Sequence, residues 1–228
     1  MDLTAPPSPE PVLQARSVYR FYRAGDEETL ALQGVSLALR RGEFVAVTGP
    51  SGSGKSTLLA CLAGMDDPDG GSVHVAGQRI SHRREPERAH IRARHIGMLF
   101  QQGNLRDHLT VRNNLALVRS LAGRRGRADR PDVIGLLGLW DRADAYPGQL
   151  SGGELARAGL AIALANAPAL VLADEPTGEL DSATETRVLE LLSAAAARGT
   201  AVLVASHSPA VAAAATRVIR LTDGRISA

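Results

Sequence analysis

Short apolar runs separated by polar segments divide this chain of 228 residues into predicted strands and helices. The runs ALVLA (169–173) and TAVLVA (200–205) are bounded by polar residues, and each fits a strand buried in a parallel sheet. EFVAVTG (43–49) ends on glycine and gives way to the helical pattern STLLACLAGM (56–65), and IGMLF (96–100) predicts a further buried strand. Strand, glycine loop and helix in this order are typical of a phosphate-binding α/β unit.

Other segments predict a second group of strands and a helical region. Residues 12–22 and 30–40 alternate imperfectly between apolar and polar positions, and residues 71–80 alternate like one half-exposed strand. Residues 104–150 predict helices joined by the Gly/Arg-rich loop AGRRGRADRP (122–131). Because the chain has no internal repeat and no sustained heptads, we interpret it as one nucleotide-binding core with a helical insert.

Composition narrows the possible partners and location. Lysine plus arginine number 26 against 24 acids, a net charge of +2, so the charge predicts no strong attraction to nucleic acid or to a membrane. The single cysteine excludes an internal disulfide and fits a reducing compartment. The start MDLTAPPSPEPV lacks the pattern of a secretory signal, and no apolar run reaches the roughly 18 residues that span a bilayer. A role at a membrane would therefore require another protein to hold the chain there.

The stretch GPSGSGKST (49–57) has the spacing Gly-x-x-x-x-Gly-Lys-Ser between a predicted strand and a predicted helix. Gly52 and Gly54 let the backbone curl so that consecutive N–H groups point into one anion-binding hollow. The helix beginning near Lys55 adds its positive dipole end, the ammonium reaches the β- and γ-phosphates, and the Ser56 hydroxyl ligates Mg²⁺. The alternative, a Gly/Ser-rich loop without a ligand, is disfavoured by the flanking strand and helix. The residues expected around the phosphates are Gly49, Pro50, Ser51, Gly52, Ser53, Gly54, Lys55, Ser56 and Thr57.

Two adjacent acids, Asp174 and Glu175, follow the apolar run of residues 169–173. The carboxyl end of a parallel strand delivers them to the crevice where α/β sheets bind ligands. We expect Asp174 to hold the Mg²⁺ ion through its water shell and Glu175 to orient and polarise the attacking water. An isolated pair of acids would be an ordinary strand-end turn, and the phosphate loop in the same chain favours the functional interpretation.

Three motifs in this order, GPSGSGKST, LSGGE (150–154) and LVLADEPTGELD (170–181), resemble those of the ATPase subunit of ABC transporters. The resemblance covers residues 12–227. It implies an α/β fold of the P-loop NTPase, ABC ATPase type, with a RecA-like core, an antiparallel β subdomain and a helical insert. The implied organisation is a mobile tail at 1–11 and one ATPase domain at 12–228, of which about 102–159 form the helical subdomain. The core and β subdomain would comprise 12–101 and 160–228.

The resemblance also implies a head-to-tail homodimer in which each subunit closes the other's ATP site. Ser151, Gly152 and Gly153 would touch the γ-phosphate of an ATP held by the partner subunit's phosphate loop. Asp181 in GELD would belong to the loop that crosses the dimer interface. ATP and Mg²⁺ are the implied cofactors, and hydrolysis would separate the subunits again.

Further positions match the family one at a time. Gln101 in MLFQQ matches the glutamine that senses Mg²⁺, with Gln102 as the adjacent alternative. His207 in VLVASHSP matches a histidine that contacts the γ-phosphate. The implied catalytic residues are Glu175, His207 and Lys55, and the implied metal-site residues are Ser56, Gln101 and Asp174.

An aromatic residue of the first strand would stack on adenine, an interaction worth about 1–3 kcal/mol. Tyr22 in RFYRAG matches that position. Tyr19 and Phe21 are near enough in the sequence to remain alternatives.

Three longer stretches are FVAVTGPSGSGKSTLLACLAGMDDPDGGSV (44–73), AYPGQLSGGE (145–154) and LADEPTGELDS (172–182). They resemble the group that powers macrolide exporters, lipoprotein release systems and the division-associated cassette. The implied partner is an integral-membrane permease with few transmembrane helices and a large extracytoplasmic domain. The chain would then lie on the cytoplasmic face of the plasma membrane, without nucleic acid. The alternative is a regulatory ABC ATPase that signals to a cell-wall or division partner. A DNA-repair or ribosomal ABC ATPase is disfavoured, because repair members carry a long coiled coil and ribosomal members carry two cassettes.

The chain departs from the group's pattern at several positions. Leu155 and Ala156 replace two glutamines after LSGGE, and a glycine follows at 159 inside a predicted helix. Ser206 and Ser208 flank the histidine where threonine and an acid are commoner. None of these changes removes a catalytic group.

The Arg/His-rich stretch 78–95 and the cysteine receive ordinary interpretations. The histidine spacings in 78–95 suit no standard metal site and nearby arginines oppose a cation, so a solvated basic helix face is expected, with contact to anionic lipid or an acidic permease loop as the alternative. Cys61 is expected to be a small core residue.

Overall fold

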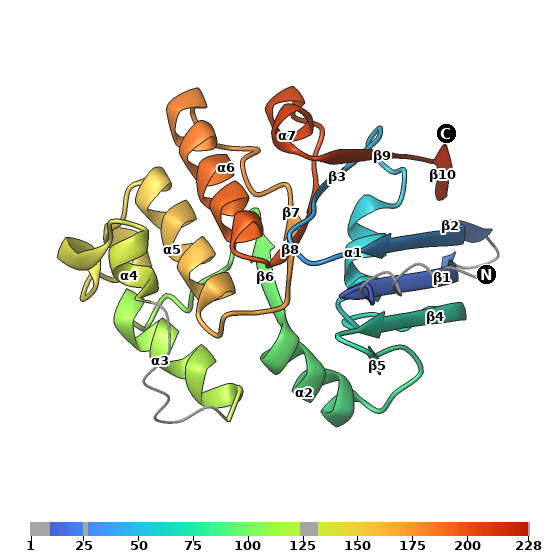
Figure 1. Cartoon of the computed structure of the whole chain (residues 1–228), viewed down its shortest axis with the longest axis horizontal. Coiled ribbons are helices and arrows are strands. Elements are labelled where there is room, and N and C mark those ends of the chain that lie inside the picture. Colours follow the sequence, from blue (N-terminus) through green and yellow to red (C-terminus); the bar gives the residue numbers. More distant parts are fainter. Residues whose placement is uncertain (1–9, 25–26, 124–131, 228) are drawn as a thin grey trace, which may run out of the picture.

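The computed structural model describes residues 10–24, 27–123 and 132–227, and its elements form two sheets with helices on either side of the larger one (Figure 1). The predicted N-terminal tail up to residue 9 and residues 124–131 of the Gly/Arg-rich loop lie outside the described residues. In chain order the elements are β1 Leu13–Ala24, β2 Glu27–Leu39, β3 Phe44–Thr48, α1 Lys55–Leu62, β4 Gly70–Val75, β5 Gln78–Arg79, α2 Glu85–His95, β6 Ile96–Phe100, α3 Val111–Leu121, α4 Val133–Leu136, 3-10 turns at Trp140–Arg142 and Pro147–Gln149, α5 Gly152–Leu164, β7 Leu170–Asp174, α6 Ser182–Ala197, β8 Ala201–Ala205, α7 Pro209–Ala214, β9 Arg217–Thr222 and β10 Arg225–Ser227.

The larger sheet has the strand order β10-β9-β3-β8-β7-β6. Strands β9, β3, β8, β7 and β6 are parallel, and β10 pairs with β9 in the antiparallel direction. The predicted parallel strands at 169–173 and 200–205 are confirmed as β7 and β8, whose side chains are almost all buried. Both strands are apolar up to Ala173 and Ala205, because helices or strands cover both faces of the sheet.

Alternate residues of the central strands enter two separate cores. Val45 and Val47 pack with α1 and the smaller sheet. Phe44 and Ala46 pack on the other face with α5, α6 and α7. The period of two along a strand therefore places α1 and α5 on opposite faces of the larger sheet (Figure 1).

The smaller sheet is antiparallel, with the order β2-β1-β4-β5, and α1 lies between it and the larger sheet. The prediction of one strand over 71–80 is wrong at its centre. Ala76 and Gly77 take positive φ angles of 49° and 76°, which turns the segment into the hairpin of β4 and β5. The antiparallel β subdomain expected from the family resemblance is present.

Helices α3, α4 and α5 follow β6 in the chain and lie together at one side of the molecule (Figure 1). Gly159 is buried inside α5, and a Cβ atom there would lie 3.1 Å from the Asn104 side chain. Asn104 in turn accepts a hydrogen bond from Phe100 N–H at 2.8 Å and donates one to Phe100 C=O at 2.7 Å. The glycine therefore lets the loop after β6 approach the helix closely, which offsets its low helix propensity.

None of the helices in the described ranges has the length and apolar character that crossing a membrane requires. Cys61 is fully buried in α1, as expected, and burial raises the pKa of its thiol to about 12. Among the same residues no group of three or more His, Cys, Asp or Glu side chains could hold a metal ion. The basic stretch 78–95 forms β5 at its start and α2 from Glu85 onward, and Arg88 and Arg92 of α2 pair with Glu85.

Candidate functional site

Four parallel strands end side by side at one edge of the larger sheet. Their register aligns Phe100 of β6 with Asp174 of β7, Asp174 with Ala205 of β8, and Ala205 with Val47 of β3. The chain leaves these strands into the phosphate loop, Glu175, His207 and Gln101. Parallel pairing thus gathers residues from four distant parts of the sequence at the position where α/β sheets bind ligands.

Close backbone contacts fix the conformation of the phosphate loop. A Cβ atom on Gly49 would lie 2.0 Å from the Leu221 carbonyl oxygen, and one on Gly54 would lie 2.4 Å from the Ala31 carbonyl oxygen. Both residues also take positive φ angles, 155° and 98°. Glycine is therefore required at both positions, because any side chain would collide with a neighbouring strand.

The loop encloses polar groups that fit a phosphate. Lys55 begins α1, and its Nζ donates to the Gly49 and Pro50 carbonyls of its own loop, both at 2.9 Å. Ser53 is 2% exposed, and its hydroxyl has no hydrogen-bond partner among the described residues. An orphaned buried hydroxyl, an ammonium and a helix N-terminus around one hollow suit a polyanion.

Beside the loop, Asp174 and Ser56 form a pair of oxygen donors. The Ser56 hydroxyl bonds to Asp174, whose Oδ1 is buried and has no partner in the described parts of the chain. Burial raises the pKa of Asp174, and the Ser56 hydroxyl opposes that shift. Both residues line a pocket of about 480 Å³ together with Gln101. A hydroxyl, a carboxylate and an amide are the oxygen ligands that Mg²⁺ accepts, so these residues fit the ion.

Glu175 lies at the end of β7 in a strained conformation, with φ of 44°. Its Oε2 accepts a hydrogen bond from the Ser206 hydroxyl at 2.8 Å, and its Oε1 lies 2.9 Å from His207 Nδ1. The Glu175 side chain is 20% exposed and that of His207 is 73% exposed. A fixed carboxylate with an accessible histidine beside it can orient a water molecule and accept its proton.

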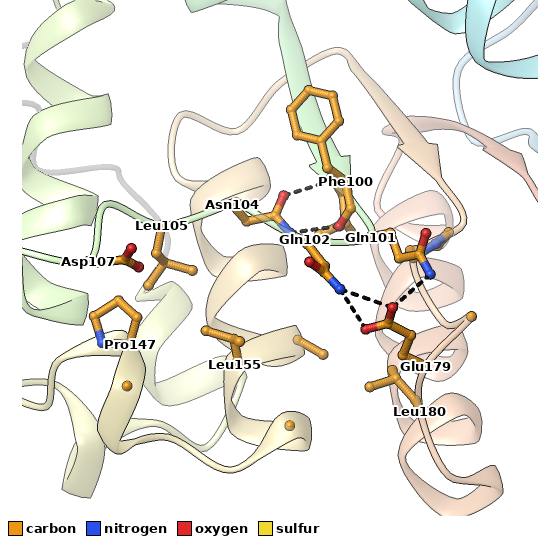
Figure 2. Close-up of a pocket in the computed structure, with 17 residues that line it drawn as sticks. Phe100, Gln101, Gln102, Asn104, Leu105, Asp107, Pro147, Leu155, Glu179 and Leu180 are labelled. Carbon is orange, nitrogen blue, oxygen red and sulfur yellow. Dashed lines mark hydrogen bonds between the residues drawn. The ribbon is translucent and has the colours of Figure 1, made fainter.

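The two glutamines after β6 both point toward Glu179 (Figure 2). Gln102 donates to both carboxylate oxygens at 2.9 Å, and Gln101 donates to one at 3.3 Å. Both also line the pocket that holds Ser56 and Asp174, so the choice between them stays open. Leu155 and Ala156, which replace the two glutamines after LSGGE, line a neighbouring pocket of about 390 Å³ that Glu179 also borders.

Tyr22 belongs to the smaller sheet. Its hydroxyl donates to Asp66 at 2.9 Å, and the Arg20 guanidinium lies 4.9 Å from the centre of its ring. Arg20 also donates to Asp66 at 2.8 Å, which fixes the three side chains together. The Tyr22 side chain remains half-exposed, like Tyr19 and Phe21. A base stacking on Tyr22 would use the ring face that Arg20 leaves uncovered.

The LSGGE motif forms the start of helix α5, and none of its residues lines the pocket that holds Ser56 and Asp174. Ser151 caps α5 by accepting from Glu154 N–H at 3.3 Å, and Glu154 accepts from Ser151 N–H at 2.9 Å. Arg142 binds Glu154 at 2.8 Å, and with the Ser151 backbone lowers the pKa of Glu154 to about 2. Ser151 and Gly152 are exposed, and nothing lies within 4 Å of a Cβ placed on Gly152.

Asp181 caps α6, accepting from the Ala183 and Thr184 N–H groups at 3.0 Å. The hydrogen bond from the Thr184 hydroxyl lowers the pKa of Asp181. A Cβ on Gly153 would lie 3.2 Å from Thr184, so Asp181 is near the LSGGE helix of its own chain. The sequence did not point to Arg20, Asp66 and Glu179, which contact the expected site, or to Glu185, which accepts from the serine after His207.

Comparison with known proteins places this architecture in a family. Residues 32–178 match the protein family described as ABC transporter. The macrolide export ATP-binding/permease protein MacB of Shigella flexneri is 43% identical over 219 residues, which are 95% of this chain and 34% of that protein. MacB of Photorhabdus laumondii is 40% identical over 218 residues, 94% of this chain and 34% of that protein. The chain thus spans about a third of the length of these curated relatives.

A solved structure of similar size matches almost throughout. It is the ATP-binding cassette MJ0796 in a dimeric, post-hydrolysis state bound to ADP and Pi. Its TM-score is 0.85 at 36% sequence identity, over 95% of this chain and 97% of that one.

Proposed function

This chain belongs to the ABC transporter family as one of its ATP-hydrolysing subunits, and from that premise we propose that it drives a partner membrane permease. ATP binding closes a head-to-tail homodimer, and hydrolysis opens it again. One observation carries the proposal. At the carboxyl ends of the parallel strands, Glu175 and His207 lie beside the Asp174–Ser56 pair. The phosphate loop and Gln101 complete this edge.

The chemistry follows from what each residue can do at that edge. Water attacks the γ-phosphorus in line, the bond to the β–γ bridging oxygen breaks, and ADP and phosphate form. Glu175 accepts the proton of the attacking water, and His207 positions the γ-phosphate. Lys55 leaves its own loop carbonyls to neutralise charge on the phosphates. Ser56, Asp174 and Gln101 would hold Mg²⁺, which supplies further charge neutralisation when bound.

The homodimer explains the exposed motif. Ser151 and Gly152 present a capped helix start on α5, across the sheet from the phosphate loop's helix α1. In a head-to-tail pair this start faces the partner's phosphates, and the dimeric state of the MJ0796 cassette supports such an arrangement. Asp181 and Gly153 would lie at the same interface. We also propose that residues from about 102 to 159 form a helical subdomain, and that this subdomain presents the LSGGE motif to the partner.

The permease would bind a groove of about 660 Å³ between α2 and α3. Its lining is mostly apolar and includes Leu121, which is 68% exposed, and Met65, which is 51% exposed. The groove also borders Gly103 and Asn104, which follow Gln101 in the chain, so an occupant could sense the nucleotide. The relatives named ATP-binding/permease support a permease as the partner. We extend the proposal to a few-pass permease with a large extracytoplasmic domain, with this chain at the cytoplasmic membrane face.

The test uses Glu175→Gln, which keeps the shape of the side chain and removes its basicity. The variant should bind ATP, form a stable dimer with MgATP on size-exclusion chromatography, and hydrolyse ATP at least about a hundredfold more slowly. Glu190→Gln, at an exposed acid on α6 that pairs with Arg187, is the matched control and should behave like the parent. Parental turnover in Glu175→Gln would overturn the assignment.

The same variant identifies the partner. Tagged Glu175→Gln, purified with MgATP from detergent-solubilised native membranes, should bring down a few-pass membrane protein with a large external domain. Recovery of only ribosomal or DNA-bound proteins would contradict the transport role and leave the ATP chemistry intact.

A further inference from the structure

A chain of hydrogen bonds joins Glu185 on α6 to the Glu175–His207 pair. The Ser208 hydroxyl and the Thr177 hydroxyl both donate to Glu185 Oε1, at 2.7 and 2.9 Å. Ser208 N–H donates to the Ser206 hydroxyl at 3.1 Å, and that hydroxyl donates to Glu175 Oε2 at 2.8 Å. One carboxylate thus fastens the loop after β7 and the loop after β8 to a third element.

The hydrogen-bond network is rigid because the side chains that form it are packed in the protein interior. Thr177 is 4% exposed and Ser206 is 1% exposed, so neither hydroxyl can exchange its partner for bulk water. Glu185 lies in the first turn of α6, where the helix dipole stabilises its negative charge, and buried residues further along α6 anchor the helix. Hydrogen bonds to a carboxylate are about twice as strong as neutral ones.

The sequence gives this network an additional meaning. Ser208, the residue that follows His207, carries no charge of its own. Here the residue after His207 supplies only a hydroxyl, and the carboxylate comes instead from Glu185 on the neighbouring helix. The Ser208 Oγ lies within 2.7 Å of Glu185 Oε1, so a carboxylate at position 208 would reach nearly the same place.

We propose that Glu185 is a positioning residue for hydrolysis, which acts through Ser208 and Thr177 to hold the His207 and Glu175 loops in register. The inference rests on the proposed function of Glu175 and His207. Glu185 touches neither the nucleotide nor the water. It fixes the separation of the two groups that do, so its loss should lower kcat and leave KM for ATP almost unchanged.

The test is a double-mutant cycle on the full chain with kcat, KM and Tm as readouts. Glu185→Ala removes both hydrogen bonds and should lower kcat about tenfold with KM within about twofold of the parent. Glu185→Gln keeps an acceptor oxygen and should retain most of the parental kcat. Glu190→Ala, five residues along the same helix, is the matched control and should leave kcat unchanged.

The effect of Ser208→Asp on kcat should have opposite signs in the parent and in Glu185→Ala. In the parent it places two carboxylates side by side and should lower kcat, whereas in Glu185→Ala it restores the missing charge and should raise kcat. A purely structural role for Glu185 predicts falls in Tm that track the falls in kcat, and no rescue by Ser208→Asp.

The outcomes separate this inference from the proposed function. A parental kcat in Glu185→Ala, or the same effect of Ser208→Asp in both backgrounds, would overturn the role of Glu185 while hydrolysis still depends on Glu175. If Glu175→Gln also hydrolyses ATP like the parent, the proposed catalytic pair itself fails.

Discussion

The two proposed anion-binding regions of this molecule, the phosphate loop and the LSGGE motif, differ in how complete they are. Around the phosphate loop, Lys55, Ser56 and Asp174 are held by their own chain, with bonds across four neighbouring strand ends. At the LSGGE motif, Ser151 and Gly152 are capped and exposed, and none of the residues lining the Ser56–Asp174 pocket belongs to that motif. Under the proposed function, the fold of one chain builds one half of the site, and the other half is a surface that a second copy would meet.

The largest expected effect is on ATP binding at the phosphate loop, the half of the site that one chain completes. Gly49→Ala would place a Cβ 2.0 Å from the Leu221 carbonyl, so ATP binding should fall by at least about a hundredfold in equilibrium titrations. Gly148→Ala is the control outside the phosphate loop, because nothing lies within 4 Å of its Cβ position and its φ is not positive, so it should leave ATP binding unchanged. Comparable losses in both variants would show that the backbone contact at Gly49 is not what shapes the loop.

A smaller effect concerns the cost of keeping Asp174 charged. Because burial raises its pKa, Asp174 holds a proton more tightly in the folded chain than in the unfolded chain. The charged carboxylate therefore destabilises the nucleotide-free protein as pH rises above the unfolded pKa, with the full effect above the folded pKa. Asp174→Asn should therefore raise Tm by roughly 1–3 °C at pH 7 and abolish the further rise on adding MgATP. The gain should vanish below about pH 4, where an unfolded aspartate is also protonated. An equal or lower Tm at pH 7 would contradict the burial argument.

The smallest effect reports on the packing behind the phosphate loop. Cys61 is buried in α1, and burial raises its pKa to about 12, so few thiolates are present at pH 8. A thiol reagent such as DTNB should react with the native chain at least about a hundredfold more slowly than with the chain in denaturant. Rapid reaction of Cys61 in the native chain would mean that the packing of α1 behind the phosphate loop opens easily.

Local patterns predicted the fold class well, because buried parallel strands are continuous apolar runs. The runs of β7 and β8 left few alternatives once the phosphate loop fixed the strand–loop–helix order. The prediction of one strand over 71–80 was wrong. The apolar–polar alternation continues through Ala76 and Gly77, but a positive φ at both residues folds the segment into a hairpin.

Site residues were foreseeable only where a motif marks them. Glu185 lies eight residues from Thr177 and 23 from Ser208, and Asp66 lies 44 from Tyr22, so no local spacing signals these contacts. The only sequence sign of the Glu185 network was an absence, the missing acid after His207. The orientation of Gln101 and Gln102 toward Glu179 depends equally on how two loops meet in space.

The most direct test of the two-half account is a mixing experiment with two inactive variants. Lys55→Ala disables the phosphate loop, and Ser151→Arg blocks the LSGGE surface while leaving ATP binding intact. In an equal mixture half of the dimers are mixed, and each of these has one complete site, so activity should return to about a quarter of the parental rate. If the mixture stays as inactive as its components, the LSGGE motif does not act on a partner's nucleotide and the central claim is contradicted.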